Sequence, residues 1–206
     1  MAELIDSEFE MIQIPFLLFT DSRTGFCYQN VERKIKLVGG SLQYGWFLVE
    51  SPFTVEATHH AVWRDKNGNL FDITPSQMPL DKALFIPDNR IEYDGRLIDS
   101  IRINITNNKV VDDFIKSDVI RNIIIAQSPQ IQEGQRAVSH PAWNKYKEFI
   151  KNIMSFLFTG NSHISSCYCN SGKSYELCHG LMFQKSWEND KSQITDVVVR
   201  LTLKGN

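Results

Sequence analysis

Three of the four cysteines of this chain lie close together near its C-terminal end. They are Cys167, Cys169 and Cys178, and His179 directly follows the last of them. Thiolates and imidazoles are preferred ligands of zinc, and a closed set of four is typical of a structural site. Gly172 lies between the two ligand pairs and favours a turn that brings them together. The segment therefore predicts one structural Zn2+ per chain.

The spacing of these residues also resembles a known motif. From Cys167 to Gly180 the chain reads CYCNSGKSYELCHG. This is similar to the SEC-C motif, a short zinc hook at the end of the preprotein translocase ATPase and in many other bacterial proteins. Asn170 stands where that motif usually has glycine, and asparagine tolerates a left-handed backbone almost as well. The resemblance implies either a staple for the fold or a surface that binds a protein partner.

The fourth cysteine, Cys27, has the features of a nucleophile. It stands at the predicted start of a helix over 27–38, and a helix N-terminus and a neighbouring imidazole both activate a thiol. His59 and His60 lie on a predicted strand, and Asp72 lies on the next strand along the chain. Two strands joined by a hairpin can place a histidine beside a carboxylate that orients it. These residues predict a Cys-His-Asp triad.

The order of these three residues resembles the transglutaminase-like branch of the papain-like superfamily. HAVW, starting at His60, is similar to the His-Ala-Trp of that branch, and LFDITP, around Asp72, is similar to its Leu-Asp-Pro-Thr. RTGFCYQN, around Cys27, is similar to the Arg-Gly-Gly-x-Cys-x-Glu-x-Asn of arylamine N-acetyltransferases. The likeness covers about Asp21 to Pro75, with one extra residue between His and Trp and isoleucine in place of a proline. It implies Cys27 as nucleophile, His60 as general base and acid, and Asp72 as the group that orients the imidazole.

Two details of this site stay open at the sequence level. Side chains alternate along a strand, so His59 and His60 face opposite sides and only one can reach the thiol. The motif favours His60, whereas His59 lies on the more apolar face. An oxyanion hole needs donors near the thiol; the Cys27 backbone N–H is one candidate and Gln43 is another. Aromatic side chains on the strands could wall a pocket or fill the core: Tyr44, Trp46 and Trp63.

The remaining pattern predicts the elements that position these residues. We expect a helix over 27–38 ended by Gly39-Gly40, then strands over 42–50, 53–64 and 70–74 with an Asn-Gly hairpin at 65–69. An irregular segment over 75–89 and one or two strands within 91–106 should follow. Helices are expected over 110–126 and 142–158, separated by a polar linker, and a last strand over 194–203. This is an α+β fold, an antiparallel sheet with packed helices and a small zinc hook. We expect a papain-like domain over 1–160 and a zinc segment over 161–206.

Composition excludes some partners. The chain has 206 residues, of which 42% are apolar and 22% charged, and its net charge of −2 would not attract nucleic acid or an anionic membrane. Its first residues lack the basic stretch of a signal peptide, and the apolar run Ile14–Phe19 is too short to span a bilayer. The cytoplasm is the expected compartment, where cysteines serve as ligands or nucleophiles more often than as disulfides.

The sequence therefore predicts a thiol-dependent acyl-transfer enzyme with a structural zinc module. It could act as a cysteine peptidase, a deamidase or a transglutaminase, with a protein or peptide as substrate. The alternative is a non-catalytic, zinc-stapled adaptor that binds a protein or ribosomal surface through the hook. A third reading keeps the papain-like shape with an inactive or repurposed pocket.

Overall fold

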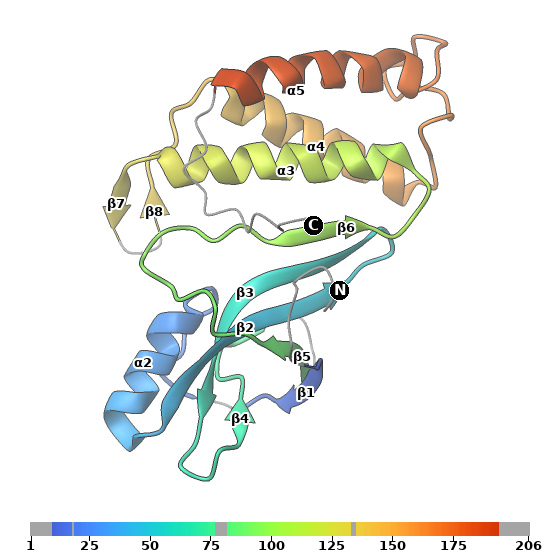
Figure 1. Cartoon of the computed structure of the whole chain (residues 1–206). Helices are drawn as coiled ribbons and strands as arrows, with labels where there is room; N and C mark the ends of the chain where they lie inside the picture. Colours follow the sequence, from blue (N-terminus) through green and yellow to red (C-terminus); the bar gives the residue numbers. More distant parts are fainter. Residues whose placement is uncertain (1–9, 18, 77–81, 133–134, 194–206) are drawn as a thin grey trace. The chain divides into compact units, whose positions relative to one another are not determined.

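The computed structural model describes residues 10–17, 19–76, 82–132 and 135–193 (Figure 1). Two compact units emerge from the packing of this chain. Among the described residues, the first unit holds the chain up to Glu50 together with Val55–Ile101, and the second holds Ser51–Thr54 and the chain from Arg102 to Gln193. The domain boundary predicted at residue 160 lies inside the second unit. The residues with candidate catalytic roles lie in the first unit, and the cysteine cluster lies in the second.

An antiparallel sheet forms the first unit. Its strands are, in spatial order, β1 (Ile12–Pro15), β5 (Lys82–Pro87), β2 (Ser41–Glu50), β3 (Thr54–Arg64) and β4 (Leu70–Phe71). A parallel bridge between Phe16 and Asp72 joins the two edges, so that the sheet is nearly closed. The prediction of a mixed α and β fold with an antiparallel sheet is confirmed in this form.

The hairpin between β3 and β4 returns the chain to the side of β3. The Asp65 side chain accepts hydrogen bonds from the backbone N–H groups of Asn67 and Asn69, both at 2.8 Å. Gly68 has a φ of 88°, which glycine adopts without strain. The Asn-Gly turn predicted from the sequence therefore places Asp72, just past β4, next to the strand that carries His60.

Helix α2 (Cys27–Val38) packs on this sheet through one apolar stripe. Val31 and Ile35, one turn apart, contact a cluster that includes Ala61 of β3 and Ile73. The helix ends where Gly39, with a φ of 80°, donates its N–H to the Ile35 carbonyl at 2.8 Å. Both ends agree with the sequence prediction, and Cys27 is the first residue of the helix.

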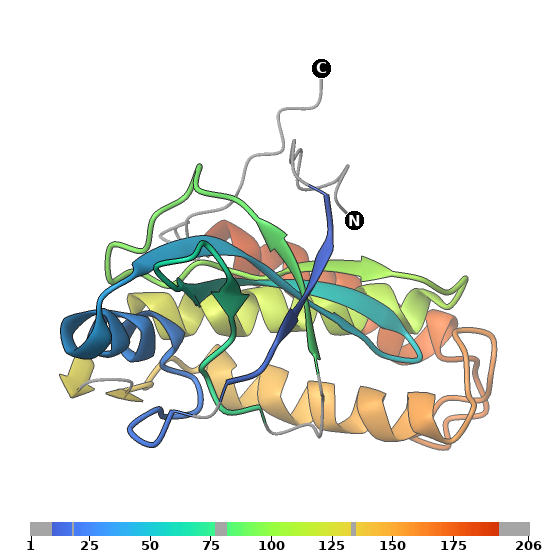
Figure 2. The ribbon, with the colours of Figure 1, turned by 90° about the horizontal axis from the view of Figure 1, so that it is seen from below.

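Helices dominate the second unit. Its elements are β6 (Ile101–Asn104), which begins at the last residue of the first unit, α3 (Lys109–Gln127), β7 (Gln130–Gln132), β8 (Gln135–Arg136), α4 (Ala142–Phe158), the π-helical turn η1 (Glu176–Gly180) and α5 (Leu181–Gln193). Figures 1 and 2 show α3, α4 and α5 running side by side. Buried residues from all three helices form one cluster, with Ile120 and Ile124 of α3 against Tyr146 of α4 and Phe183 of α5.

Some elements differ from the expectation, among them the short strands β7 and β8 in the segment expected to be a polar linker. β5 lies within the segment 75–89, which we expected to be irregular because of its prolines. It pairs with β1 on one side and with β2 on the other, and β1 was not predicted as a strand. These strands are hydrogen-bonded to partners distant in sequence, which local composition does not reveal. The helix α5 follows the zinc segment, where we expected the chain to continue directly into a strand. The strand predicted over 194–203 lies outside the described residues.

Candidate active site and metal centre

Cys27, His60 and Asp72 come together in the first unit. Cys27 opens α2 and is 8% exposed. The His60 Nε2 lies 3.0 Å from the Asp72 Oδ2. Because a carboxylate oxygen accepts, Nε2 carries the proton and donates, and Nδ1 is the ring nitrogen left for the thiol. This is the arrangement in which an imidazole can exchange a proton with a cysteine while a carboxylate fixes its tautomer.

The electrostatics of His60 agree with this arrangement. Burial of the ring opposes its positive charge, but the neighbouring Cys27 and Asp72 side chains, through their charges and through hydrogen bonds to the ring, raise the pKa of His60 to about 10. The imidazolium form is therefore favoured at neutral pH. The His60 side chain remains 13% exposed, so the ring is not sealed in the core.

Asp72 is held from several directions. Its backbone N–H donates to the Pro15 carbonyl at 3.0 Å, and its carbonyl accepts from the Leu17 N–H at 2.9 Å. Its Oδ1 accepts from the Thr74 N–H at 2.8 Å, which leaves Oδ2 for His60. With a side chain and a backbone both fixed and only 2% of the residue exposed, the carboxylate is preorganised to orient the imidazole.

His59 has a different environment. Its Nε2 donates to the Ile91 carbonyl at 3.1 Å, so its Nδ1 accepts from the Tyr28 hydroxyl at 2.9 Å. Its ring also contacts Trp46 edge-on. Burial lowers the pKa of His59 to about 4, so the ring is neutral at pH 7. The two neighbouring histidines thus occupy opposite faces of β3, and His60 is the one that meets Asp72.

The lowered pKa of His59 has a consequence for stability. Between pH 6.5 and about 4 the unfolded chain binds a proton at His59 that the folded chain does not. The free energy of unfolding should fall through this window as the pH drops, by up to about 1.4 kcal/mol per pH unit from this one group. His59→Gln, which keeps an amide donor for the Ile91 carbonyl, should remove that part of the slope. Urea unfolding of both proteins across the window tests this, and equal slopes would contradict it.

The start of α2 presents free donors beside the thiol. No side chain caps this helix end, and the first intrahelical bond runs from the Asn30 N–H to the Phe26 carbonyl. Within the described residues no group accepts the Cys27 N–H, which leaves it available to an oxyanion. Gln43, the other sequence candidate, has both amide hydrogens engaged, with the Tyr44 carbonyl at 2.7 Å and with the Asn89 Oδ1 at 2.9 Å.

Asn30 lies beside the candidate site, and the sequence alone predicts no role for it. It is fully buried, and its Nδ2 donates to the Arg23 carbonyl at 2.9 Å and to the Thr74 Oγ1 at 3.2 Å. Its Oδ1 accepts from the Arg23 N–H at 3.0 Å. It thereby ties the loop before Cys27 to the segment after Asp72. The signal for it was the asparagine that ends RTGFCYQN.

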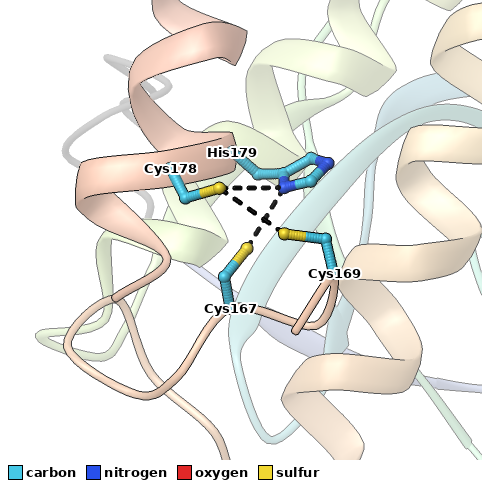
Figure 3. A group of neighbouring side chains, drawn as sticks. All are labelled: Cys167, Cys169, Cys178 and His179. Carbon is cyan, nitrogen blue, oxygen red and sulfur yellow. Dashed lines mark hydrogen bonds between the residues drawn. The ribbon is translucent and has the colours of Figure 1, made fainter. Parts of the chain in front are cut away.

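In the second unit, Cys167, Cys169, Cys178 and His179 converge on one point (Figure 3). Their ligand atoms all lie within 4.8 Å of one another, with the Cys169 and Cys178 sulfurs 3.5 Å apart and the His179 Nδ1 3.1 Å from the Cys167 sulfur. A tetrahedral zinc ion with bonds of about 2.3 Å to sulfur needs sulfurs about 3.8 Å apart. The four side chains therefore could hold a metal ion, as the spacing predicted.

Turns specific to the motif bring the ligands together. Asn170 has a φ of 58° and Gly172 a φ of 75°, both in the left-handed region. Between the ligand pairs, the Cys167 N–H donates to the Lys173 carbonyl at 2.8 Å and closes the loop. Gly180 packs against Tyr175, where an added Cβ would come within 3.1 Å of the tyrosine ring. Asn170 thus holds a backbone conformation that glycine adopts without strain.

The backbone of Asn170 leads to a matched pair of substitutions. Asn170→Ala should lower the free energy of unfolding by about 1 kcal/mol, because a Cβ without a polar group is disfavoured in the left-handed region. Asn170→Gly should be neutral or slightly stabilising, since glycine adopts this conformation freely. Chemical unfolding of the two variants tests the order, and equal losses for both would show that the asparagine side chain matters for another reason.

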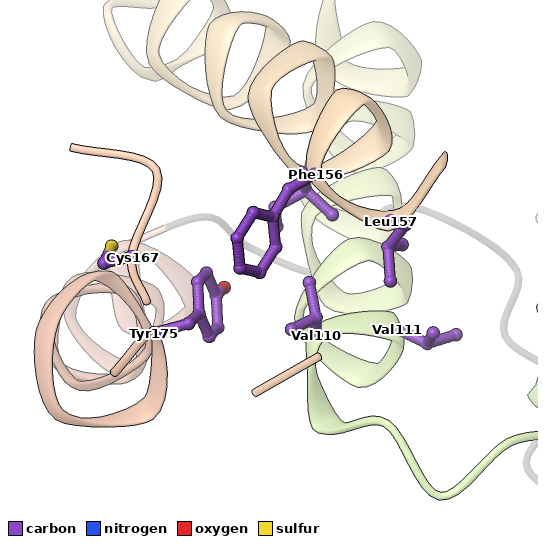
Figure 4. Packing of buried hydrophobic residues seen from close by; sticks show 7 residues of the cluster. Val110, Val111, Phe156, Leu157, Cys167 and Tyr175 are labelled. Atoms are coloured by element: carbon purple, nitrogen blue, oxygen red, sulfur yellow. The ribbon is translucent and has the colours of Figure 1, made fainter. Parts of the chain in front are cut away.

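A buried tyrosine anchors the hook to the helices. Tyr175 stacks on Phe156 of α4 with ring centroids 5.7 Å apart, and its hydroxyl donates to the Asp113 Oδ2 of α3 at 2.9 Å. Cys167 belongs to the same buried cluster (Figure 4). Gln184 of α5 donates to the other oxygen of Asp113. The metal ligands are therefore continuous with the core of the second unit.

The protonation of the thiols differs across the cluster. A hydrogen bond from Ser171 is the main cause that lowers the pKa of Cys169 to about 6, so this exposed ligand favours the thiolate. Burial raises the pKa of Cys167. Two open cavities of about 350 and 360 Å³ border the cluster, the first lined by Cys167 and Tyr168, the second by Tyr168 and His179.

No helix in the described part of the chain has the length and apolar character needed to cross a membrane. Comparison with known proteins adds no relative: no family model, no curated protein and no solved structure matches this chain.

Proposed function

We propose that this chain is a thiol-dependent acyl-transfer enzyme of the transglutaminase-like kind, with Cys27 as nucleophile. The observation that carries the proposal is the position of His60, which interacts with the Cys27 thiol on one side and with the Asp72 carboxylate, at 3.0 Å, on the other. A nucleophile, a base and an orienting group in this order are the minimum that covalent acyl transfer needs. A buried cysteine that served only as packing would not need a charged partner.

The chemistry follows from these contacts. The Cys27 thiolate attacks the carbonyl carbon of a carboxamide, a sulfur–carbon bond forms, and the carbonyl electron pair moves to oxygen. When that pair returns, the carbon–nitrogen bond breaks and the His60 imidazolium gives its proton to the leaving nitrogen. Neutral His60 then takes a proton from water or from an amine, which attacks the thioester and releases the thiolate. Water makes the enzyme a peptidase or deamidase; an amine makes it a transglutaminase.

The metal in the second unit is proposed to be zinc with a structural role. Three thiols and one imidazole leave no position for a substrate, which is the composition of a closed zinc site. Resemblance to the SEC-C motif supports the same assignment. Cys167, Cys169, Cys178 and His179 would hold the ion, and the chemistry it supplies is the cross-linking of the hook.

A second candidate function, an adaptor, is supported by the surface near the cluster. Leu177, Leu181 and Met182 lie on η1 and the start of α5 and are exposed. Met182 also lines the cavity beside His179. An apolar surface of this kind fits a protein partner better than water. This role does not need Cys27, so reactivity of that thiol separates the two proposals.

The test is selective alkylation of the intact, metal-loaded protein with iodoacetamide at neutral pH, followed by peptide mapping. Cys27 should be labelled faster than a free cysteine peptide, because His60 favours the thiolate. His60→Gln should slow the labelling of Cys27. If Cys27 reacts no faster than the peptide, or if His60→Gln leaves its rate unchanged, the enzyme proposal is wrong and the adaptor role takes its place.

A further inference from the structure

A cavity of the second unit lies between the metal ligands and the helices α4 and α5. Its volume is about 360 Å³, and it is open to solvent. Phe149 of α4 and Phe183 of α5 stack in its wall with ring centroids 4.5 Å apart. Tyr168 of the hook and Met182 of α5 add further apolar surface. A mostly apolar lining with a few polar groups is the usual form of a binding pocket.

The imidazole of His179 separates this cavity from the metal cluster. Its Nδ1 lies 3.1 Å from the Cys167 sulfur, and its Nε2 is on the side of the ring away from the three sulfurs (Figure 3). A metal held at Nδ1 leaves the proton on Nε2. An N–H of this kind ordinarily donates to a carboxylate, a carbonyl or a water. Within the described residues no side chain or carbonyl accepts it, and His179 lines the cavity.

Two further donors line the same cavity. The side-chain amide of Asn152, on α4, has no hydrogen-bond partner in the described part of the chain. The Lys145 ammonium donates to the Ser186 Oγ and, at 2.5 Å, to the Asp190 Oδ2. An ammonium carries three hydrogens, so one is left for a ligand. Together with the His179 N–H, these groups offer donors from α4 and from the hook.

The charges around the cavity favour a ligand that accepts hydrogen bonds. Glu148 is the acidic side chain of the lining, but it is 63% exposed and lies 3.8 Å from the Lys151 Nζ. Water and this partner weaken its field inside the cavity. A carboxylate accepts several hydrogen bonds at once, and a charged acceptor binds donors more strongly than a neutral one. The lining therefore fits a carboxylate joined to an apolar group.

The surroundings favour the end of a polypeptide over a free acid. The cavity is open, whereas a pocket for a small molecule buries most of its ligand. Met182 lines the cavity and is 63% exposed. Leu181 beside it and Leu177, one helical turn earlier, are 50% and 65% exposed. This apolar surface can cover the residues that precede a C-terminal one.

We infer that the cavity binds the C-terminal residue of a partner polypeptide. The apolar side chain of that residue lies against Phe149 and Phe183, and its carboxylate accepts from the His179 Nε2–H, the Asn152 amide and the Lys145 ammonium. The inference goes beyond the acyl-transfer proposal and does not depend on Cys27. It gives the adaptor role a partner of stated chemistry, and it rests on the proposed zinc ion, which keeps the proton on Nε2.

The experiment titrates the peptide acetyl-Ala-Ala-Leu-Phe, with a free carboxylate, into the full zinc-loaded chain in a calorimeter. The same peptide with a C-terminal amide should bind about 10- to 100-fold more weakly, because hydrogen bonds to a charged acceptor are lost. Asn152→Asp should weaken binding of the free carboxylate to a similar degree, since it replaces a donor by a like charge. Asn144→Asp is the matched control, the same change at an exposed position of α4 outside the cavity lining. It should bind as the native chain does.

His179→Cys tests the imidazole without removing the metal, because four thiolates also form a closed zinc site. This variant should keep its zinc ion and bind the peptide about 10-fold more weakly than the native chain. A zinc-loaded His179→Cys protein that binds the peptide with native affinity would show that the Nε2–H is not a ligand contact, and the inference would be wrong.

The remaining outcomes separate the possible failures. Equal affinity for the carboxylate and the amide peptide, or no binding of either by the zinc-loaded chain, overturns the inference alone. If phenylpropionate, an acid without a peptide bond, binds as tightly as the peptide, the cavity holds a small acid and the inferred partner is wrong. A native chain without zinc refutes the metal site and this inference together. Failure of the acyl-transfer proposal appears elsewhere, in slow alkylation of Cys27.

Discussion

Replacing Cys178 by serine should empty the metal site and sharply destabilise the second unit. Serine is a poor zinc ligand, and three remaining ligands bind far more weakly than four. An ion present at 1,000 times its Kd stabilises a fold by about 4 kcal/mol, and this contribution would be lost. The loss should reach the helices, because Cys167 and Tyr175 belong to the same buried cluster as Phe156. Metal analysis and thermal unfolding of the purified proteins measure both effects.

The native protein should carry about one zinc ion per chain, as a closed four-ligand site implies. Cys27→Ser is the matched control, since it makes the same chemical change outside the cluster. It should keep the metal and nearly the native melting temperature. A strong chelator should lower the melting temperature of the native chain and leave that of Cys178→Ser unchanged. A native protein purified without chelator that holds no metal would refute the site.

His60→Gln should abolish most of the acyl-transfer activity, by about 10²- to 10⁴-fold, because it removes the group that shuttles the proton. His59→Gln, one residue away, is the control: His59 lies on the other face of β3 and is bound to Tyr28 and to the Ile91 carbonyl. It should retain activity. Turnover of p-nitrophenyl acetate by both variants decides the matter, and a His59→Gln protein as inactive as His60→Gln would show that the wrong histidine has been assigned.

A feature of the fold or of the candidate sites could be predicted from the sequence where the residues that determine it are close together in the chain. The four metal ligands lie within thirteen residues, and their turns are encoded by Asn170 and Gly172, so the cluster follows from sequence alone. Helix α2 was predictable from Val31 and Ile35 and from the glycines that end it. The choice between His59 and His60 could not be predicted. Alternation along β3 places the two side chains on opposite faces of the strand, but it does not say on which face Asp72 lies. That depends on the register of the hairpin and on a bridge to Phe16, a residue far away in the chain.

The strand β5 also could not be predicted from its local sequence. The prolines of the segment 75–89 are a local signal against regular structure, but β1 and β2 pair with this strand from both sides. Partners distant in sequence supply hydrogen bonds that a local reading cannot weigh. α5 was a different kind of omission. Phe183 and Trp187 lie four residues apart, which is a helical spacing, and both pack in a cluster with residues of α3 and α4. This spacing was present in the sequence but was not used to predict a helix after the metal ligands.

The bridge between Phe16 and Asp72 ties the position of Asp72 to the segment that directly follows β1. The Pro15 carbonyl and the Leu17 N–H hold the Asp72 backbone, and the Thr74 N–H holds its side chain at Oδ1. If Asp72 orients His60 as proposed, removing β1 should lower the acyl-transfer activity, although β1 contains none of the residues proposed to meet the substrate.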